Sequence, residues 1–237
     1  MSSPVVFRTG TDATAAFDAG LRRHMLSIYN NMGVGLVITG LVALLVASTP
    51  ALYQSIFGTP LKWVAMLAPL AFVFLLSFRI DRMTEASART AFFAFAAVMG
   101  MSMASIFLVF TGASIARTFF IAAAMFLSVS LWGYTTKSDL SKWSTFLFMG
   151  VIGIVIASLV NIFISSSALL MVVSIVGVAI FTGLTAWDTQ RLKSEYAYYA
   201  GTEHAGKLRI MGALSLYLNF VNLFQLLLTF FGQREES

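Results

Sequence analysis

The sequence predicts an all-α polytopic membrane protein, a single domain of seven transmembrane helices formed by the whole chain, residues 1–237. Two observations lead to this prediction. Hydrophobic residues make up 59% of the chain and charged residues only 11%, and the mean hydropathy of +0.87 lies far above that of soluble domains. Uncharged runs also recur along the chain, the longest from Trp143 to Trp187, and a helix needs about 20 apolar residues to cross a bilayer.

Each long run predicts one helix. We expect helices at residues 28–48, 61–78, 91–111, 116–134, 143–164, 168–187 and 210–231. Alternating segments of about ten residues, which indicate a membrane β-barrel, are not found. Residues 1–27 are polar and lack the apolar stretch and cleavage site of a secretory signal, so they are expected to form a cytoplasmic amino-terminal segment. Residues 192–209 are expected to form the longest internal loop.

The basic residues predict the orientation, because cytoplasmic loops of membrane proteins carry an excess of lysine and arginine. One side of the predicted bundle has Arg8, Arg22, Arg23, Arg79, Arg82, Arg89, Lys137, Lys142, Arg191, Lys193, Lys207 and Arg209. The opposite side has only Lys62, Arg117 and Arg234. The amino terminus is therefore expected in the cytoplasm and the carboxyl terminus outside. Topology and contact with anionic lipid explain the net charge of +5, and nucleic acid is not expected as a partner.

The residue content argues against several classes of membrane protein. The chain has no cysteine and two histidines, His24 and His204, neither of which lies in a predicted span. A zinc site and an intramembrane serine protease are therefore not expected. An aspartyl protease needs two acids within its spans, and only Asp188 lies near one. We expect no enzymatic activity, no cofactor and no tight metal site.

Asp188 is the most informative residue of the sequence. It ends the longest uncharged run, at a depth where burial of an acid costs desolvation free energy. Two interpretations are open. The carboxylate lies either at the wet boundary of the membrane, in an ion pair with Arg191, or inside the bundle for a functional reason.

The last predicted helix carries a polar stripe. Ser215, Asn219 and Asn222 are spaced at i, i+4 and i+7, and Gln225 and Thr229 continue the same stripe. Because unsatisfied amides in hydrocarbon are costly, this helix is expected at the centre of the bundle. The stripe either holds neighbouring helices together by hydrogen bonds or lines a hydrated path, and the amides alone favour the first interpretation.

Two motifs give the chain a family resemblance. The first, Thr182-Gly-Leu-Thr-Ala-Trp-Asp-Thr-Gln190, ends the sixth predicted helix, and the second, Gly212-Ala-Leu-Ser-Leu-Tyr-Leu-Asn-Phe-Val-Asn-Leu-Phe224, forms the seventh. The segment that begins Tyr29-Asn-Asn-Met32 fits the same pattern in the first helix. Together they resemble the bacterial branch of the Bax inhibitor family, the transmembrane Bax inhibitor motif proteins. The resemblance covers nearly the whole chain.

The resemblance implies six helices around a central seventh and a pH-sensitive leak of calcium ions across the membrane. It implies a sensor made of two aspartates, one at the end of helix six and one in helix seven, with an arginine of helix two as a latch. Asp188 matches the first aspartate, but Asn219 stands at the second position and cannot titrate. We expect Asp188 and Asn219 to form a contact and the leak to depend less on pH than in the family pattern. Arg79 and Arg82 are equal candidates for the latch.

A second function class remains beside the leak. A hard cation prefers six to eight oxygen ligands, so the chain supports only transient calcium passage rather than tight binding. The alternative is a non-enzymatic stress-protection protein that binds and modulates another membrane protein, such as a quality-control protease. In either case, the resemblance to the bacterial branch places the chain in the lipid bilayer of a bacterial inner membrane.

Overall fold

The computed structural model describes residues 10–202 and 204–235, and all of its long elements are helices. They are α1 (Gly10–Ser48), α2 (Pro50–Phe57), α3 (Leu61–Arg79), α4 (Glu85–Met103), α5 (Ile106–Val109), α6 (Gly112–Thr135), α7 (Ser144–Ile164), α8 (Ser167–Tyr199) and α9 (His204–Phe231), with 3-10 turns η1 (Ile80–Arg82) and η2 (Leu140–Trp143). Within the described residues, seven helical segments are long and apolar enough to cross a membrane. The predicted all-α polytopic fold is therefore confirmed.

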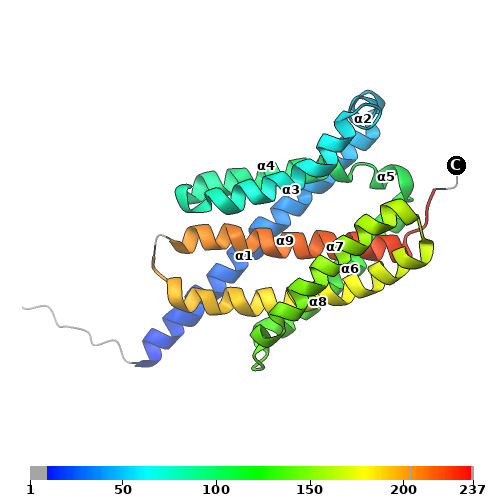
Figure 1. Cartoon of the computed structure of the whole chain (residues 1–237). Helices are drawn as coiled ribbons and strands as arrows, with labels where there is room; N and C mark the ends of the chain where they lie inside the picture. Colours follow the sequence, from blue (N-terminus) through cyan, green and yellow to red (C-terminus); the bar gives the residue numbers. More distant parts are fainter. Residues whose placement is uncertain (1–9, 203, 236–237) are drawn as a thin grey trace, which may run out of the picture.

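Helix α9 lies at the centre of the bundle. In Figure 1 it runs through the middle of the molecule, with α3 and α4 on one side and α8 on the other, while α7 crosses in front of it. It packs against α1, α4, α6 and α8. The most apolar part of α9 is 56% buried, whereas that of every other candidate span is 39% buried or less. The expectation drawn from its polar stripe is confirmed.

A cluster around Tyr217 joins α9 to α1 and α4. The Tyr217 ring is fully buried and lies edge-on to Phe92 and Phe95, with ring centroids 5.7 and 5.6 Å away. Its hydroxyl lies 2.6 Å from the hydroxyl of Thr39, which is also 2.9 Å from the carbonyl oxygen of Ala96. The junction therefore combines apolar burial with satisfied polar groups, as a membrane interior requires.

Two glycines allow neighbouring helices to approach closely. A Cβ atom at Gly100 of α4 would lie 2.6 Å from the carbonyl oxygen of Thr39 on α1, and one at Gly133 of α6 would overlap the backbone of Ala186 on α8. Any side chain at either position would push the two backbones apart. Small residues at helix contacts serve the same purpose throughout membrane bundles, where packing replaces the hydrophobic effect.

The structure corrects several predicted helix ends. Helix α8 continues to Tyr199, so the loop expected at 192–209 shrinks to a turn around Gly201, whose φ is +80°. Helix α1 begins at Gly10 rather than at residue 28. Both errors have one cause: hydropathy marks where the lipid ends, whereas a helix continues as long as its residues favour helical backbone. Ion pairs from Arg191 to Asp188 and Glu195 support the polar part of α8.

The region predicted as one helix at 91–111 is instead two. Helix α4 starts earlier, at a capping box formed by Thr84 and Ser87, and ends at Met103. The chain then turns at Ala104 and Ser105 before the single turn of α5. Helix α2, which begins at Pro50, was expected as a loop because its eight residues are too short to span a membrane.

Candidate functional site

Asp188 lies inside the bundle and has two polar partners. Only 5% of the surface of Asp188 is exposed. Oδ2 accepts a hydrogen bond of 2.7 Å from the Asn219 amide of α9, and Oδ1 accepts one of 2.5 Å from the guanidinium of Arg191. The sequence left open whether Asp188 forms an ion pair with Arg191 or is buried inside the bundle. The structure shows both, because the ion pair with Arg191 forms and the carboxylate is buried.

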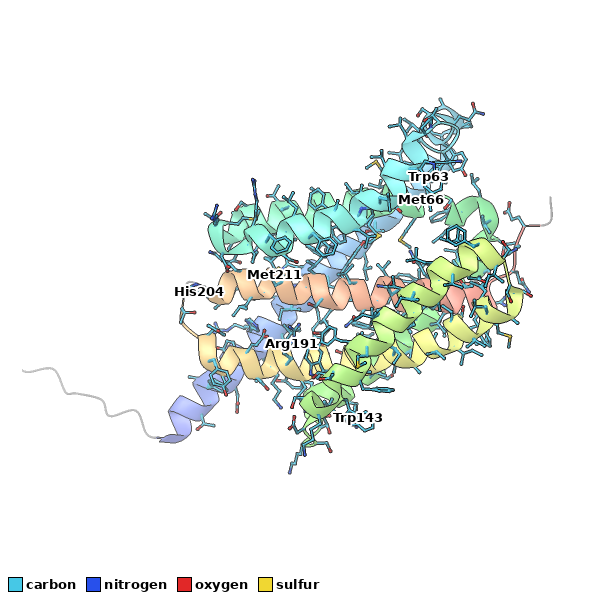
Figure 2. The ribbon with its side chains drawn as sticks, in the orientation of Figure 1. Trp63, Met66, Trp143, Arg191, His204 and Met211 are labelled. Carbon is cyan, nitrogen blue, oxygen red and sulfur yellow. The ribbon has the colours of Figure 1, made fainter. Side chains whose placement is uncertain are left out.

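The local sequence explains how the three groups meet. Asp188 and Arg191 are three residues apart on α8 and so share one face of that helix. Helices α8 and α9 pack along each other and bring Asn219 opposite that face. The guanidinium of Arg191 also stacks over the Trp187 ring at 4.9 Å and donates to the Ser215 hydroxyl at 3.3 Å. Figure 2 places Arg191 on α8 beside α9.

A cavity of about 730 Å³ extends along α9 between α3, α7 and α8. Its α9 wall contains the whole polar stripe: Ser215, Asn219, Asn222, Gln225 and Thr229. Asp188 and Arg191 line the same cavity from α8, whereas the walls formed by α3 and α7 are mainly apolar. The structure thus brings the candidate carboxylate and the candidate polar residues to one space.

The hydrogen bonds of the stripe bear on its role. Asn222 donates to the carbonyl oxygen of Leu218, and Thr229 donates to that of Gln225, each at 2.8 Å and within α9 itself. In the described part of the chain the Gln225 amide makes no hydrogen bond, and only Ser215 and Asn219 bond to another helix. Most side chains of the stripe therefore do not hold helices together. This favours the other interpretation, that the stripe lines a hydrated path.

A smaller cavity continues the polar surface toward the opposite end of the bundle. It measures about 280 Å³ and shares Gln225 and Thr229 with the larger one. Ser102 and Ser105, which lie where the chain breaks between α4 and α5, complete its polar lining. Polar side chains therefore follow α9 from Arg191 to this break.

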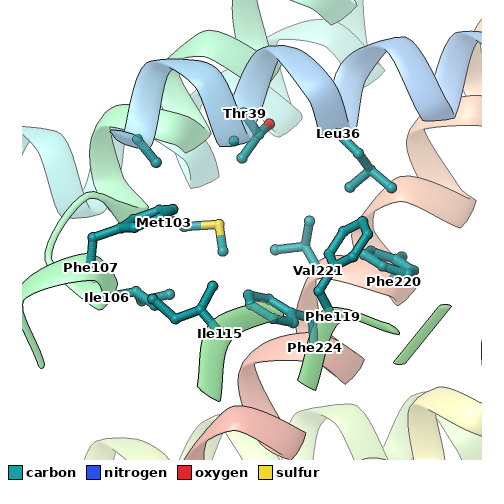
Figure 3. Close-up of a pocket in the computed structure, with 12 residues that line it drawn as sticks. Leu36, Thr39, Met103, Ile106, Phe107, Ile115, Phe119, Phe220, Val221 and Phe224 are labelled. Carbon is teal, nitrogen blue, oxygen red and sulfur yellow. The ribbon is translucent and has the colours of Figure 1, made fainter. Parts of the chain in front are cut away.

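The other face of α9 is different in character. An apolar cavity of about 100 Å³ lies there, between α1, α5, α6 and α9. Figure 3 shows its aromatic and aliphatic lining, including Phe119, Phe220 and Phe224, with the side chain of Thr39 at the edge. The Thr39 hydroxyl is already engaged with Ala96 and Tyr217, and the other lining side chains are apolar, so the two faces of α9 are chemically distinct.

The predicted latch residues lie elsewhere. Arg79 ends α3 and Arg82 ends η1, and both are exposed. Neither has an ion pair with any residue that the structure describes, and neither lines the cavity around Asp188. Arg191 occupies the position beside the carboxylate. The sequence had indicated Arg191 only as the partner of a wet boundary charge.

One polar cluster was missed from the sequence. The Ser130 hydroxyl of α6 lies 2.9 Å from the hydroxyl of Thr189 on α8 and also contacts the hydroxyl of Tyr29 on α1. Thr189 follows Asp188 directly and is fully buried. Hydroxyl residues inside apolar runs were the available signal, because they must find partners in hydrocarbon just as amides must.

Comparison with known proteins identifies the family. The family model described as inhibitor of apoptosis-promoting Bax1 matches residues 21–236. The chain belongs to the Bax inhibitor family. The match begins within α1 and extends past α9, so it covers most of α1, all the later helices and the residues around Asp188 of this Bax inhibitor family protein.

Bacterial relatives of this Bax inhibitor family protein cover almost the same length. An uncharacterised protein of Rickettsia prowazekii is 44% identical over 229 residues, which are 96% of this chain and 97% of the relative. Inner membrane protein YbhL of Escherichia coli K12 is 44% identical over 219 residues, 91% of this chain and 94% of YbhL. A protein of Caulobacter vibrioides is 43% identical over 235 residues, 94% of each chain. The chain is thus a membrane protein related along its length to an inner membrane protein.

Proposed function

We propose that the protein is a passive leak for calcium and similar cations in a bacterial inner membrane, with Asp188 as the gate carboxylate. One observation supports this most directly: Asp188 is buried in the wall of the same cavity that holds the polar stripe of α9. A cavity with amide and hydroxyl groups along one wall offers water and ions an alternative to hydrocarbon. The sparse oxygen ligands fit transient passage rather than tight binding.

In this proposal Arg191 keeps the path closed. Its guanidinium pairs with Asp188 and, on the same wall of the cavity, opposes the approach of a cation. An ion can use the carboxylate oxygens only after Arg191 has moved away. Arg191 thereby takes the latch role that the family resemblance gives to an arginine of helix two, and Arg79 and Arg82 are left outside the gate.

The proposal is tested by calcium flux into liposomes that contain the purified protein. Asp188→Asn leaves Arg191 with only the more distant Glu195 as an ion-pair partner, so calcium flux is expected to fall. Arg191→Gln leaves the carboxylate without its ion-pair partner, so flux is expected to rise. Two unit charges 4 Å apart interact by about 1 kcal/mol in bulk water and by about 4 kcal/mol near a protein surface. Each substitution is therefore expected to change the calcium flux roughly tenfold.

Asp139→Asn is the matched control. Asp139 is exposed between α6 and α7, and the hydrogen bonds from the side chain and backbone of Ser141 lower its pKa, so it is ionised at neutral pH. The control removes one negative charge without changing the cavity, and its flux should equal that of the unmodified protein. Flux that is unchanged in Asp188→Asn and Arg191→Gln would refute the gate and favour the second candidate, a protein that restrains a membrane partner.

A further inference from the structure

A second polar cavity lies at the end of the bundle where α8 turns into α9. It measures about 560 Å³ and shares no lining residue with the cavity around Asp188. Its walls come from α1, the start of α4, the end of α8 and the first turn of α9. Figure 2 marks this end of the molecule by His204, the first residue of α9. The proposed ion path makes no use of this cavity.

The charged residues of this cavity leave it positive. Arg23 and Arg209 line it, and Glu85 is its one acidic residue among those described. Glu85 is already matched by two arginines, because it accepts hydrogen bonds from Arg209 at 3.0 and 3.1 Å and from Arg89 at 2.8 Å. Arg23 is exposed and has no ion pair within the described residues. One positive charge therefore faces the cavity without a partner.

Buried polar atoms at this cavity also lack partners. His24 lines the cavity and is 4% exposed, yet its Nδ1 atom has no hydrogen-bond partner among the described residues. The Nε atom of Arg209 is also buried and has no hydrogen-bond partner among the described residues. Buried polar groups are nearly always hydrogen-bonded, because leaving one unpaired costs free energy. A neutral histidine can carry its proton on Nδ1, so both atoms are potential donors. Both have almost no accessible surface, so an acceptor in the cavity reaches them when the two side chains shift on binding.

The first turn of α9 adds a third feature that favours an anion. Ala205 and Gly206 line the cavity at the start of this 28-residue helix. The first amide groups of a helix have no partners within it, and the helix dipole makes that end partly positive. The Ala205 amide already donates to the carbonyl oxygen of Thr202 at 3.2 Å, so this end of α9 contributes the positive end of the helix dipole rather than free amides. That dipole, the unpaired Arg23 and an unpartnered histidine together favour phosphate oxygens.

We propose that this cavity binds a phosphate group, presented either by a phospholipid headgroup or by a soluble phosphate compound. Arg23 supplies the free charge, the start of α9 supplies the positive end of its dipole, and His24 and Arg209 supply donors after a shift of their side chains. Both sources share this chemistry. They differ in whether an acyl chain accompanies the phosphate, and the experiment separates them on that basis.

The test uses the full-length protein in dodecyl maltoside, a detergent without phosphate. Inorganic phosphate is titrated in one arm and short-chain phosphatidic acid in the other, and binding is followed by calorimetry and by the ring nitrogen signals of 15N-histidine. The chain has two histidines, so His204→Ala assigns the His24 signal. We expect at least one probe to bind and to shift the His24 signal.

Arg23→Gln and Arg22→Gln form the matched pair of variants. Both arginines are exposed on α1, but only Arg23 lines the cavity, and neither is needed for packing. Loss of one charge-assisted contact is expected to weaken binding about tenfold in Arg23→Gln. Binding by Arg22→Gln should stay within about twofold of the unmodified protein, as expected for an exposed charge that does not line the cavity.

Each outcome decides the proposal. Binding of inorganic phosphate that depends on Arg23 supports a site for soluble phosphate compounds, and binding of phosphatidic acid alone supports a headgroup site. The proposal is overturned if neither probe shifts the His24 signal. It is overturned equally if Arg22→Gln and Arg23→Gln weaken binding to the same extent, because the attraction would then be the general charge of the surface.

Discussion

Asp188 is held from two sides by groups of different chemistry. Arg191 balances its charge, and Asn219 donates a hydrogen bond without contributing charge. An amide in that position differs from a carboxyl group in one respect that matters for a pH response, because it neither gains nor loses a proton. The contact therefore contains one titratable acid, where the family pattern implied by the sequence contains two.

Restoring the second acid should restore a steep pH response. In Asn219→Asp two carboxyl groups would face each other within hydrogen-bond distance, and such groups titrate as a coupled pair that shares a proton. We expect calcium flux into liposomes to vary more steeply between pH 6 and 8 in this variant than in the unmodified protein. Asn222→Asp, on the same cavity wall but hydrogen-bonded only within α9, is the control for an added acid. A steep response in the unmodified protein that persists in Asp188→Ala would contradict this assignment.

At the residue scale the sequence indicated Asp188 and Asn219 correctly as neighbours, whereas the latch role of Arg79 or Arg82 stays a prediction, because the arginine beside Asp188 is Arg191. The positions of the two motifs along α8 and α9 limit which faces of these helices can pack together. The faces that carry Asp188 and Asn219 are in contact, as expected. A latch from α3 depends on how far that helix leans toward α8, which no local pattern encodes. The position of Arg191 can be predicted without knowing how helices pack, because a residue three positions along the same helix lies beside Asp188.

At the scale of the element, α9 is a helix with two distinct faces. One face joins Tyr217 to α1 and α4 in a dry junction, and the other turns its amides and hydroxyls toward the cavity. The polar stripe could be derived from the sequence because helical spacing is regular. The length of α8 and the break after α4 could not, since hydropathy does not distinguish a helix that leaves the membrane from a loop.

The polar face should react with water-soluble reagents. The chain contains no cysteine, so single cysteines can be introduced without a background. In liposomes, Gln225→Cys is expected to react with a charged thiol reagent roughly tenfold faster than Leu223→Cys or Phe120→Cys, because the reactive thiolate forms only where water is present. Leu223 is fully buried, and Phe120 is 71% exposed within a span of α6, so it is expected to face lipid. Equal rates for Gln225→Cys and Phe120→Cys would show that the cavity holds lipid instead of water.

The whole molecule is polarised in charge. Basic residues gather in the helix ends next to the α8 to α9 turn (Arg191, Lys193, Lys207 and Arg209), in η1 (Arg82) and in η2 (Lys142). The α2 to α3 connection lies at the other end of the molecule in Figure 1. The phosphate cavity proposed here opens at the basic end, and the small cavity beside the α4 break lies toward the opposite one. The orientation in the membrane decides in which direction a calcium gradient would drive the leak. It also decides which leaflet would supply anionic headgroups to the phosphate cavity.

The distribution of charge predicts that orientation, and single cysteines can measure it. Arginine and lysine next to spans are retained in the cytoplasm, so the turn with Thr202 should face inward and Thr59, at the connection between α2 and α3, should face outward. In bacterial spheroplasts an impermeant maleimide is expected to label Thr59→Cys directly and Thr202→Cys only after the membrane has been opened. Both positions are exposed in polar turns, so differences in burial cannot produce the contrast. Labelling of Thr202→Cys in intact spheroplasts would place the basic end outside and would reverse the direction assigned to the leak.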